Sequence, residues 1–390
     1  MSTQPPSARV EGSDRPELEE VRVGYIPLTD CASLIMAAEL GFDRRYGLRI
    51  VPERQASWAA VRDRLVAGEL HASQALYGQV YGIHTGLGGV QEAMNILIAL
   101  SRNGQAITLS RTLLAHGVRD GESLARHLAQ ATQRATFAQT FPTGTHAMWL
   151  YYWLAAHGID PMHDIHRIVV PPPDMSINLR RGNMDGFCAG EPWNQHAILE
   201  GVGFTVATSQ QIWPDHPEKV LATTARFTRE YPATARALIC AVLEAARWLD
   251  ASPANRVRAA GLIAAPHHLD IAPATIQGRM LGEYEDGLGR QWQDAHPMQF
   301  FADGEASFPW LSDGMWFLAQ HQRWGMLGRV EHEQIARSIH RTDLYAEAAR
   351  ALGVSLPARP LRSSVLMDGE VWDGSRPDRY LPPHADPRAR

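Results

Sequence analysis

The stretch VRVGYIPLTDCASLIMAAELGFDRRYGLRIVPERQ, residues 21–55, indicates the fold because two apolar runs enclose one helical pattern. Residues 21–28 are predicted to form a buried strand, and residues 48–55 a second strand. The segment between them is predicted to be a helix that ends at Gly41 or continues toward Gly47. A strand, a helix and a strand in this order predict an open, mostly parallel α/β sheet.

The same alternation continues along the chain. A helix with Ser57 as its N-cap and two further strands are expected over residues 57–70, 94–101 and 105–110. A second run of strands and helices is expected over residues 134–141, 145–158, 166–173, 175–183, 184–192 and 203–209. After about residue 224 the pattern becomes helical and shows no new strand. Two α/β lobes with a ligand cleft, a hinge and a helical C-terminal part are the predicted architecture.

We expect four parts with the following boundaries. They are a flexible N-terminal tail over 1–20, a first lobe over 21–115 plus 225–360, a second lobe over 116–224, and a C-terminal arm or tail over 361–390. The last part is rich in Pro and Arg, which favours an arm or a disordered tail.

Composition excludes several classes of protein. The chain has 390 residues, 45% of them apolar, and a formal net charge of -5, so it can bury a large core and lacks the basic footprint of a nucleic-acid-binding protein. Cys31, Cys188 and Cys240 match neither a zinc spacing nor a disulfide framework, and we interpret them as core thiols. No apolar run is long enough to span a membrane. The first twenty residues contain neither an apolar run nor a basic start, so we expect no export signal and a cytoplasmic location.

One cation stands apart from the others. Of the 37 basic residues only Lys219 is a lysine, and all the rest are arginines. One interpretation is that compositional drift left a single lysine at this position by chance. Alternatively, position 219 requires a compact ammonium with three donors, which the flat guanidinium does not imitate.

Ligands of open α/β sheets bind at the carboxyl ends of the strands, where several polar residues are expected. Gln55, Ser57 and Trp58 lie at one strand-to-helix junction, and Gln105 follows Gly104 at the start of a strand. His146 lies in the first turn of a helix, after Thr143 and Thr145, where free N-H groups and the helix dipole favour an anion. Each residue has a structural alternative, since Trp58 can serve packing alone and His146 can be an incidental polar residue.

Other patterns do not indicate chemistry. The aromatic tract Trp149, Tyr151, Tyr152 and Trp153 is better explained by helix packing than by a cofactor site. His163 and His166 lack a third ligand, and the histidines at 267, 268 and 332 are interpreted as solvated. No nucleophile elbow, P-loop or dinucleotide fingerprint is present, so we expect no metal, no cofactor and no catalysis.

Several motifs carry a family resemblance. VRVGYIPLTDCASLIMAAELGFDRRYGL, QASWAAVRDRL, TFPTGTHAMWLYYWLAAHGIDP, IVVPPPDMSINLRRGNMDGFCAGEPWN, DHPEKV and MDGEVWDGSRPDRYL closely resemble the nitrate- and bicarbonate-binding proteins of the NrtA and CmpA family. The resemblance covers about residues 21–381. It implies a fold of the periplasmic-binding-protein type II, with an anion held between two lobes.

The resemblance also implies ligand-binding residues. Trp58, Gln105, His146 and Lys219 match the positions that form the anion shell in nitrate-binding members, with Gly104, Gly144 and Thr145 as candidate backbone contributors. In bicarbonate-binding members an acidic residue and a calcium ion serve instead of the lysine, so Lys219 favours nitrate or nitrite. Because nitrate only accepts hydrogen bonds, we expect a pocket of donors without a carboxylate.

Two departures shift the expected role. The chain lacks the export signal expected of transport receptors, and its segment around LVAGELHASQALYGQVYG is shorter than theirs. In both features it resembles the cytosolic nitrate sensors called NasS. That resemblance implies a sensor that holds an RNA-binding antiterminator of the ANTAR class, NasT-like, and releases it when nitrate or nitrite binds. The alternatives are the binding component of a nitrate or bicarbonate ABC transporter and, less favoured, an enzyme related to pyrimidine synthases of the same fold, which use an active-site histidine.

Overall fold

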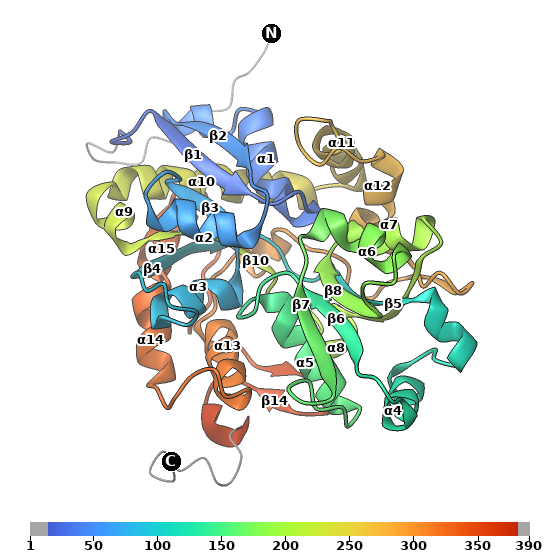
Figure 1. Ribbon diagram of the computed structural model, residues 1–390. Coiled ribbons are helices and arrows are strands. Elements are labelled where there is room, and N and C mark those ends of the chain that lie inside the picture. Colours follow the sequence, from blue (N-terminus) through green and yellow to red (C-terminus); the bar gives the residue numbers. More distant parts are fainter. Residues whose placement is uncertain (1–14, 381–390) are drawn as a thin grey trace.

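A computed structural model describes residues 15–380, which form two five-stranded sheets lying side by side (Figure 1). The first sheet has the strand order β2-β1-β3-β10-β4. Its strands are β1 (Glu20–Tyr25), β2 (Arg49–Arg54), β3 (Ala72–Leu76), β4 (Met94–Ala99) and β10 (Lys219–Thr224). The second sheet has the order β7-β6-β8-β5-β9. Its strands are β5 (Gln105–Ser110), β6 (Ala135–Gln139), β7 (Ile165–Val169), β8 (Gly186–Gly190) and β9 (Gly203–Thr208).

Each sheet is mostly parallel, as predicted, with one antiparallel strand. β10 runs antiparallel to both of its neighbours in the first sheet, and β5 does the same in the second. These two strands follow the two crossings of the chain between the lobes, over residues 100–104 and 209–218. The predicted boundaries after residues 115 and 224 are therefore wrong, because β5 joins the second sheet and β10 returns to the first.

Helices cover the sheets and continue into the C-terminal part (Figure 1). In the first two-thirds of the chain they are α1 (Ala32–Glu39), α2 (Trp58–Val66), α3 (Tyr77–Thr85), α4 (Gly121–Gln130), α5 (Thr145–Ala156), α6 (Met175–Arg180), α7 (Trp193–Leu199), α8 (Ser209–Ile212) and α9 (Ala225–Glu230). The later ones are α10 (Pro232–Asp250), α11 (Pro253–Ile263), α12 (Pro273–Leu281), α13 (Leu311–Arg323), α14 (His332–Ile339) and α15 (Thr342–Ala351). Short 3-10 turns add η1 (Thr29–Cys31), η2 (Asp43–Tyr46), η3 (Arg111–His116), η4 (Pro172–Asp174), η5 (Ala302–Gly304) and η6 (Pro377–Tyr380).

Local chemistry explains several helix ends. The Ser57 hydroxyl accepts a hydrogen bond from the amide of Ala60, which confirms Ser57 as the N-cap of α2. Pro232 opens α10, where its missing N-H costs nothing. The helix predicted after β1 ends as α1 at Glu39, and Gly41 then adopts a positive φ of 69°.

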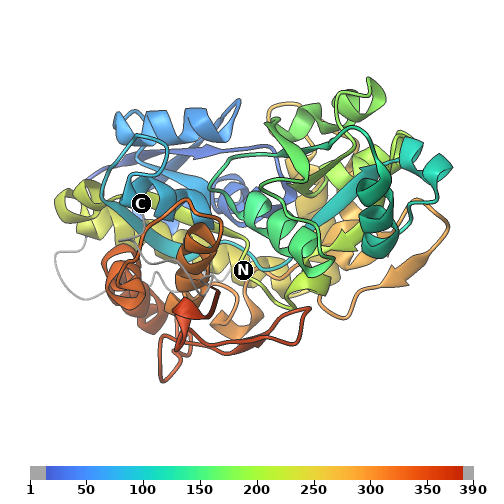
Figure 2. The same ribbon diagram turned by 60° about the horizontal axis from the view of Figure 1, so that its bottom comes forward.

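The prediction that no strand follows residue 224 is wrong. A hairpin of β11 (Glu283–Glu285) and β12 (Gln291–Gln293) extends from the C-terminal part along the second lobe (Figure 2). There the amide of Thr205 donates to the carbonyl of Asp286 at 2.9 Å, and Arg111 donates to the carbonyl of Gly287 at 2.7 Å. The hairpin is too short to show a strand pattern, and it is stabilised by these tertiary contacts.

The two chain ends are packed as far as the structure describes them. Within the predicted arm, β13 (Ser364–Val365) pairs with β14 (Val371–Trp372), and the buried Trp372 indole donates to the carbonyl of Ser312 at 2.7 Å. Residues 15–20 of the predicted flexible tail are also bound, since the Glu17 carboxylate accepts from the amides of Ala233 and Thr234. The prediction of a flexible tail is wrong for residues 15–20, because they pack onto α10, whereas the described part of the C-terminal segment is an arm packed on α13. Residues 1–14 and 381–390 lie outside the described part.

Cys31, Cys188 and Cys240 are buried and unpaired, which confirms the interpretation as core thiols. None of the helices within residues 15–380 combines the length and apolar character needed to cross a bilayer.

Candidate functional site

Lys219 begins β10, directly after the chain returns from the second lobe, and its side chain is fully buried. Its Nζ lies 3.0 Å from Asp30 Oδ2 and 3.4 Å from His146 Nε2, and it also contacts the carboxylate of Glu218. Lys219 thus joins η1 of the first lobe to α5 of the second. Burial lowers the pKa of the Lys219 ammonium, and the neighbouring Asp30 carboxylate opposes this shift.

His146 lies in the first turn of α5 and is fully buried. Its Nδ1 is 2.5 Å from the Thr140 hydroxyl. Because an ammonium has no lone pair, His146 Nε2 accepts from Lys219 while Nδ1 carries the ring hydrogen and donates to Thr140. Burial, together with the charge of Lys219, holds the pKa of His146 well below its usual value, so the ring is neutral.

An aromatic cluster supports α5 beneath this histidine. Trp149 packs edge to face on Trp213 at 5.7 Å between ring centroids and lies 4.7 Å from Trp316. Tyr151, Tyr152 and Trp153 are buried as well, which confirms that the aromatic tract serves packing.

Trp58 opens α2, and the centroid of its ring lies 5.7 Å from Lys219 Nζ. Its backbone carbonyl accepts from Gln79 Nε2 at 2.6 Å, which anchors the start of the helix. The indole Nε1 is buried and has no hydrogen-bond partner within residues 15–380. A buried donor without a partner is costly, so this N-H is available to a ligand.

Gln105 lies where β5 enters the second sheet. Its backbone is held by Ser209, whose hydroxyl accepts from the Gln105 amide at 3.1 Å and donates to its carbonyl at 3.0 Å. The side-chain amide is fully buried, yet both its nitrogen and its oxygen lack partners in the described chain. Gly190 pairs with Gln105, and a Cβ built at Gly190 would lie 3.2 Å from Asp30 Oδ2, so this part of the second sheet lies against the Asp30 carboxylate.

The candidate backbone contributors differ in what they offer. The Gly144 N-H already donates to the Phe141 carbonyl at 3.0 Å. Gly104 has a φ of 91°, and a Cβ there would lie 2.0 Å from Met298 Cε, so close packing accounts for this glycine. The Thr145 hydroxyl is buried without a partner between residues 15 and 380, so the side chain rather than the backbone is its free group.

The cluster around Lys219 contains two carboxylates, which were not expected in a nitrate pocket. Asp30 and Glu218 are both fully buried against Lys219, and one oxygen of Glu218 has no partner among the described residues. Burial raises the pKa of the Asp30 carboxyl, opposed by Lys219, and Gln74 donates to the same carboxylate. Glu218 stands next to Lys219 in the DHPEKV motif, and Asp30 follows the first strand, so both positions carried a signal that the sequence reasoning missed.

The lobes meet directly beside this cluster. The amide of Thr29 donates to the carbonyl of Glu191 at 2.8 Å, and the Trp193 indole donates to the carbonyl of Pro27 at 2.8 Å. The buried Glu191 carboxylate also lies 3.2 Å from Arg279 Nε on α12. The GEPWN motif therefore connects the second lobe to the first, and the cluster around Lys219 is enclosed between them.

Two α/β lobes that enclose buried, unpartnered hydrogen-bonding groups define a ligand-binding protein of the periplasmic-binding-protein type II fold. The chain matches the NMT1-like family over residues 14–264 and belongs to that family.

Its relatives include the nitrate/nitrite-binding protein NrtA of Synechocystis, which is 37% identical over 96% of this chain and 87% of the relative. The bicarbonate-binding protein CmpA of Synechococcus elongatus is 30% identical, covering 95% of this chain and 87% of the relative. The crystal structure of the periplasmic nitrate-binding protein NrtA from Synechocystis superposes with a TM-score of 0.90 and 35% identity, over 94% of this chain and 98% of that chain. These similarities confirm the resemblance to the NrtA and CmpA family and the fold that it implies.

Proposed function

We propose that this chain binds nitrate or nitrite between its lobes as the substrate-binding component of an ABC transporter, without converting the anion chemically. The observation that carries the proposal is the meeting of the sole lysine with His146 and Trp58 in one enclosed cluster. The relatives named for nitrate binding and the NrtA crystal structure support the same ligand class.

Each group has a role suited to an anion that only accepts hydrogen bonds. Lys219 supplies the charge-assisted bond, and Trp58 Nε1 supplies a donor that has no partner within residues 15–380. Gln105 supplies its side-chain N-H groups. His146 donates from Nε2 once its hydrogen moves from Nδ1, which the Thr140 hydroxyl allows because it can donate as well as accept.

Bicarbonate is the second candidate ligand. It carries an O-H that needs an acceptor, and the buried carboxylates of Asp30 and Glu218 provide acceptors beside Lys219. The similarity to CmpA adds support for this ligand. Calorimetric titration with nitrate, nitrite and bicarbonate, with and without calcium, separates the candidates. A response to bicarbonate alone would overturn the nitrate proposal.

A matched pair of variants tests the site. Gln105→Leu removes the unpartnered amide, and we expect nitrate affinity to fall about 5-fold to 10-fold, the effect of one neutral hydrogen bond. Gln320→Leu removes another buried glutamine whose side-chain amide is equally unpartnered in the described chain but which lies on α13, and affinity should stay unchanged. Equal effects of the two variants would place the anion elsewhere.

The sensor role is a second candidate, motivated by the resemblance of the segment around LVAGELHASQALYGQVYG to the cytosolic nitrate sensors. In that role the chain is cytoplasmic and holds an ANTAR-type antiterminator until the anion shifts the lobes toward the closed state. We expect His146→Ala to retain the partner and to become insensitive to nitrate. Fractionation of the untagged native protein, together with pull-down of the antiterminator with and without nitrate, distinguishes this role from transport. Export of the protein would exclude it.

A further inference from the structure

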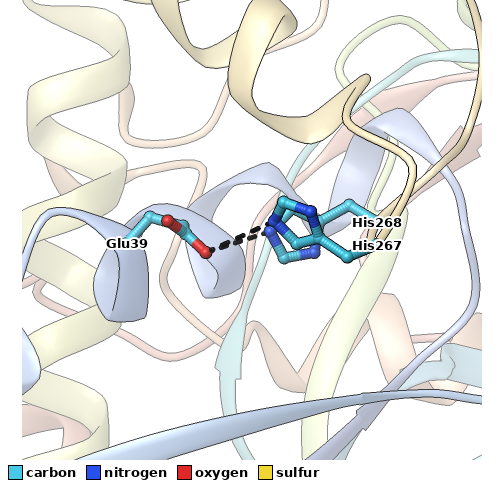
Figure 3. Close-up of side chains that lie close together, drawn as sticks. All are labelled: Glu39, His267 and His268. Atoms are coloured by element: carbon cyan, nitrogen blue, oxygen red, sulfur yellow. Dashed lines mark hydrogen bonds and ion pairs between the residues drawn. The ribbon is translucent and has the colours of Figure 1, made fainter.

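A second cluster of ligand-type side chains lies outside the anion site. Glu39 is the last residue of α1, and His267 and His268 lie in the loop after α11 (Figure 3). One potential metal-ligating atom from each of the three residues lies within 4.8 Å of the others. Within residues 15–380 this is the one group of three such side chains that meets this spacing.

His268 is the fixed member of the cluster. Its side chain is only 5% exposed, and its Nε2 lies 3.1 Å from Glu39 Oε1. On the other side of the ring, Nδ1 lies 3.2 Å from the hydroxyl of Tyr25 at the end of β1. A second partner on the far ring nitrogen is the arrangement that orients histidines toward metal ions.

The hydrogen bonds of Tyr25 leave the Nε2 of His268 facing an acceptor. The Tyr25 hydroxyl donates to the backbone carbonyl of His267 at 3.2 Å, and its oxygen then accepts from the Nδ1-H of His268. In this arrangement a neutral His268 ring directs its Nε2 lone pair at the Glu39 carboxylate. A divalent cation between His268 Nε2 and the Glu39 carboxylate, whose atoms lie 3.1 Å apart, satisfies both groups.

His267 and Glu39 are free to adjust. The His267 side chain is 68% exposed, and its Nε2 lies 4.0 Å from Glu39 Oε1. The two imidazole rings lie 4.2 Å apart between centroids. Zinc bonds to nitrogen and oxygen of about 2.0–2.2 Å require ligand atoms about 3.3 Å apart in a tetrahedron, so small rotations of these two exposed side chains close the site.

We propose that Glu39, His267 and His268 bind one divalent transition-metal ion of the zinc, nickel and copper class, with water in the remaining position. Two imidazoles and one carboxylate are the ligands that this class prefers, and calcium does not bind imidazole readily. The bound ion connects α1 to the loop after α11 within the first lobe. The proposal is independent of the anion that the chain binds.

Zinc binding to the untagged full chain, measured by calorimetry in a buffer that does not chelate metals, tests the site. We expect one equivalent to bind, calcium to give no signal, and zinc to raise the melting temperature. His267→Ala and Glu39→Gln alter exposed side chains, and each should weaken zinc binding at least 10-fold and abolish the thermal shift. Cobalt should give the visible absorption of a low-coordinate site in the native chain only.

His163→Ala is the matched control, because His163 is an exposed histidine 2.8 Å from the carboxylate of Asp160 and belongs to no group of three ligand-type side chains within residues 15–380. Zinc binding by this variant should equal that of the native chain. The proposal is overturned if the native chain binds no zinc, if His267→Ala and Glu39→Gln bind it as tightly as the native chain, or if His163→Ala weakens binding equally. Nitrate titrations of the same variants should be unchanged, which separates this site from the one at Lys219.

Discussion

Nitrate binding is expected to consume a proton, because the anion enters a cluster with more carboxylates than cations. Lys219 is balanced by Asp30 at 3.0 Å, which leaves Glu218 as the additional acidic group. Glu218 Oε1 lies 3.7 Å from His146 Nε2, so an anion that touches both Lys219 and His146 lies close to this carboxylate.

The size of the effect follows from Coulomb's law. Two like charges roughly 4 Å apart repel each other by about 4 kcal/mol at an effective permittivity of about 20. Uptake of one proton by the cluster removes most of this repulsion. Since the anion-bound state then holds one more proton than the free state, binding strengthens as pH falls, by about tenfold in Kd per pH unit.

Replacing Glu218 by glutamine removes the repulsion permanently. We expect Glu218→Gln to bind nitrate at least tenfold more tightly than the native chain at pH 8 and to show little dependence on pH. Calorimetry between pH 6 and 8, in buffers of different ionisation enthalpy, measures both Kd and the number of protons taken up. The native value should be about one proton per anion and the variant value near zero.

The control for this experiment is Glu333→Gln, which removes an exposed carboxylate paired with Arg337 on α14. Its affinity and proton uptake should match those of the native chain. If the native chain takes up no proton, or if Glu218→Gln retains the native pH dependence, Glu218 does not repel the bound anion. Asp30→Asn, which removes the other carboxylate, repeats the test should Glu218→Gln fail to fold.

Three further outcomes follow from the structure. Lys219→Met leaves two buried carboxylates without their cation and should lower the free energy of unfolding by about 3–5 kcal/mol. The double variant Lys219→Met/Asp30→Asn should regain part of this free energy. Urea unfolding measures both values, and equal stability of the single and the double variant would contradict the expectation. Burial lowers the pKa of His340 to about 4, below the unfolded value of about 6.5, so its contribution to stability is present above pH 6.5 and is lost as pH falls toward 4. The native chain should therefore lose about 1.4 kcal/mol per pH unit more than His340→Gln between pH 6 and 4.5 in urea titrations, and identical slopes would speak against a neutral ring. Trp193→Phe removes the indole hydrogen bond to Pro27 and should weaken nitrate binding about 5-fold. Small-angle scattering should show that the unliganded variant is more open than the native protein. Unchanged affinity and scattering would mean that this contact does not favour closure of the two lobes.

The sequence predicted many of the local elements, missed β3, α3, α4 and β10, and assigned strands to sheets less well. The N-cap at Ser57 and the strands on both sides of α1 were evident because hydrophobic period and capping chemistry act within a few residues. The membership of β5 was not evident, because a short apolar strand fits the interior of either sheet, and β3 and β10 were not among the predicted strands. Only pairing with residues far along the chain decides which lobe such a strand joins.

The two candidate sites show the same division between what the sequence revealed and what only the folded structure revealed. The single lysine and the histidine at the start of α5 were found as unusual residues in suitable positions, whereas Asp30 lies 189 residues from Lys219 and was not connected with it. The histidines at 267 and 268 were interpreted as solvated, which holds for His267 and is wrong for His268, and α1 places Glu39 beside both. Sequence spacing does not show which distant carboxylate meets a given cation.

By itself, therefore, the sequence determined the class of fold, the core thiols, the packing role of the aromatic tract and the family resemblance, because these depend on local pattern and composition. The tertiary structure decided the two strand exchanges between lobes, the closed junction at Glu191 and Trp193, and the charge of the candidate anion site. Charge balance is a property of groups brought within a few ångströms of each other by the whole fold. For this reason the lysine that suggested a simple anion pocket is, in the folded chain, the partner of two carboxylates.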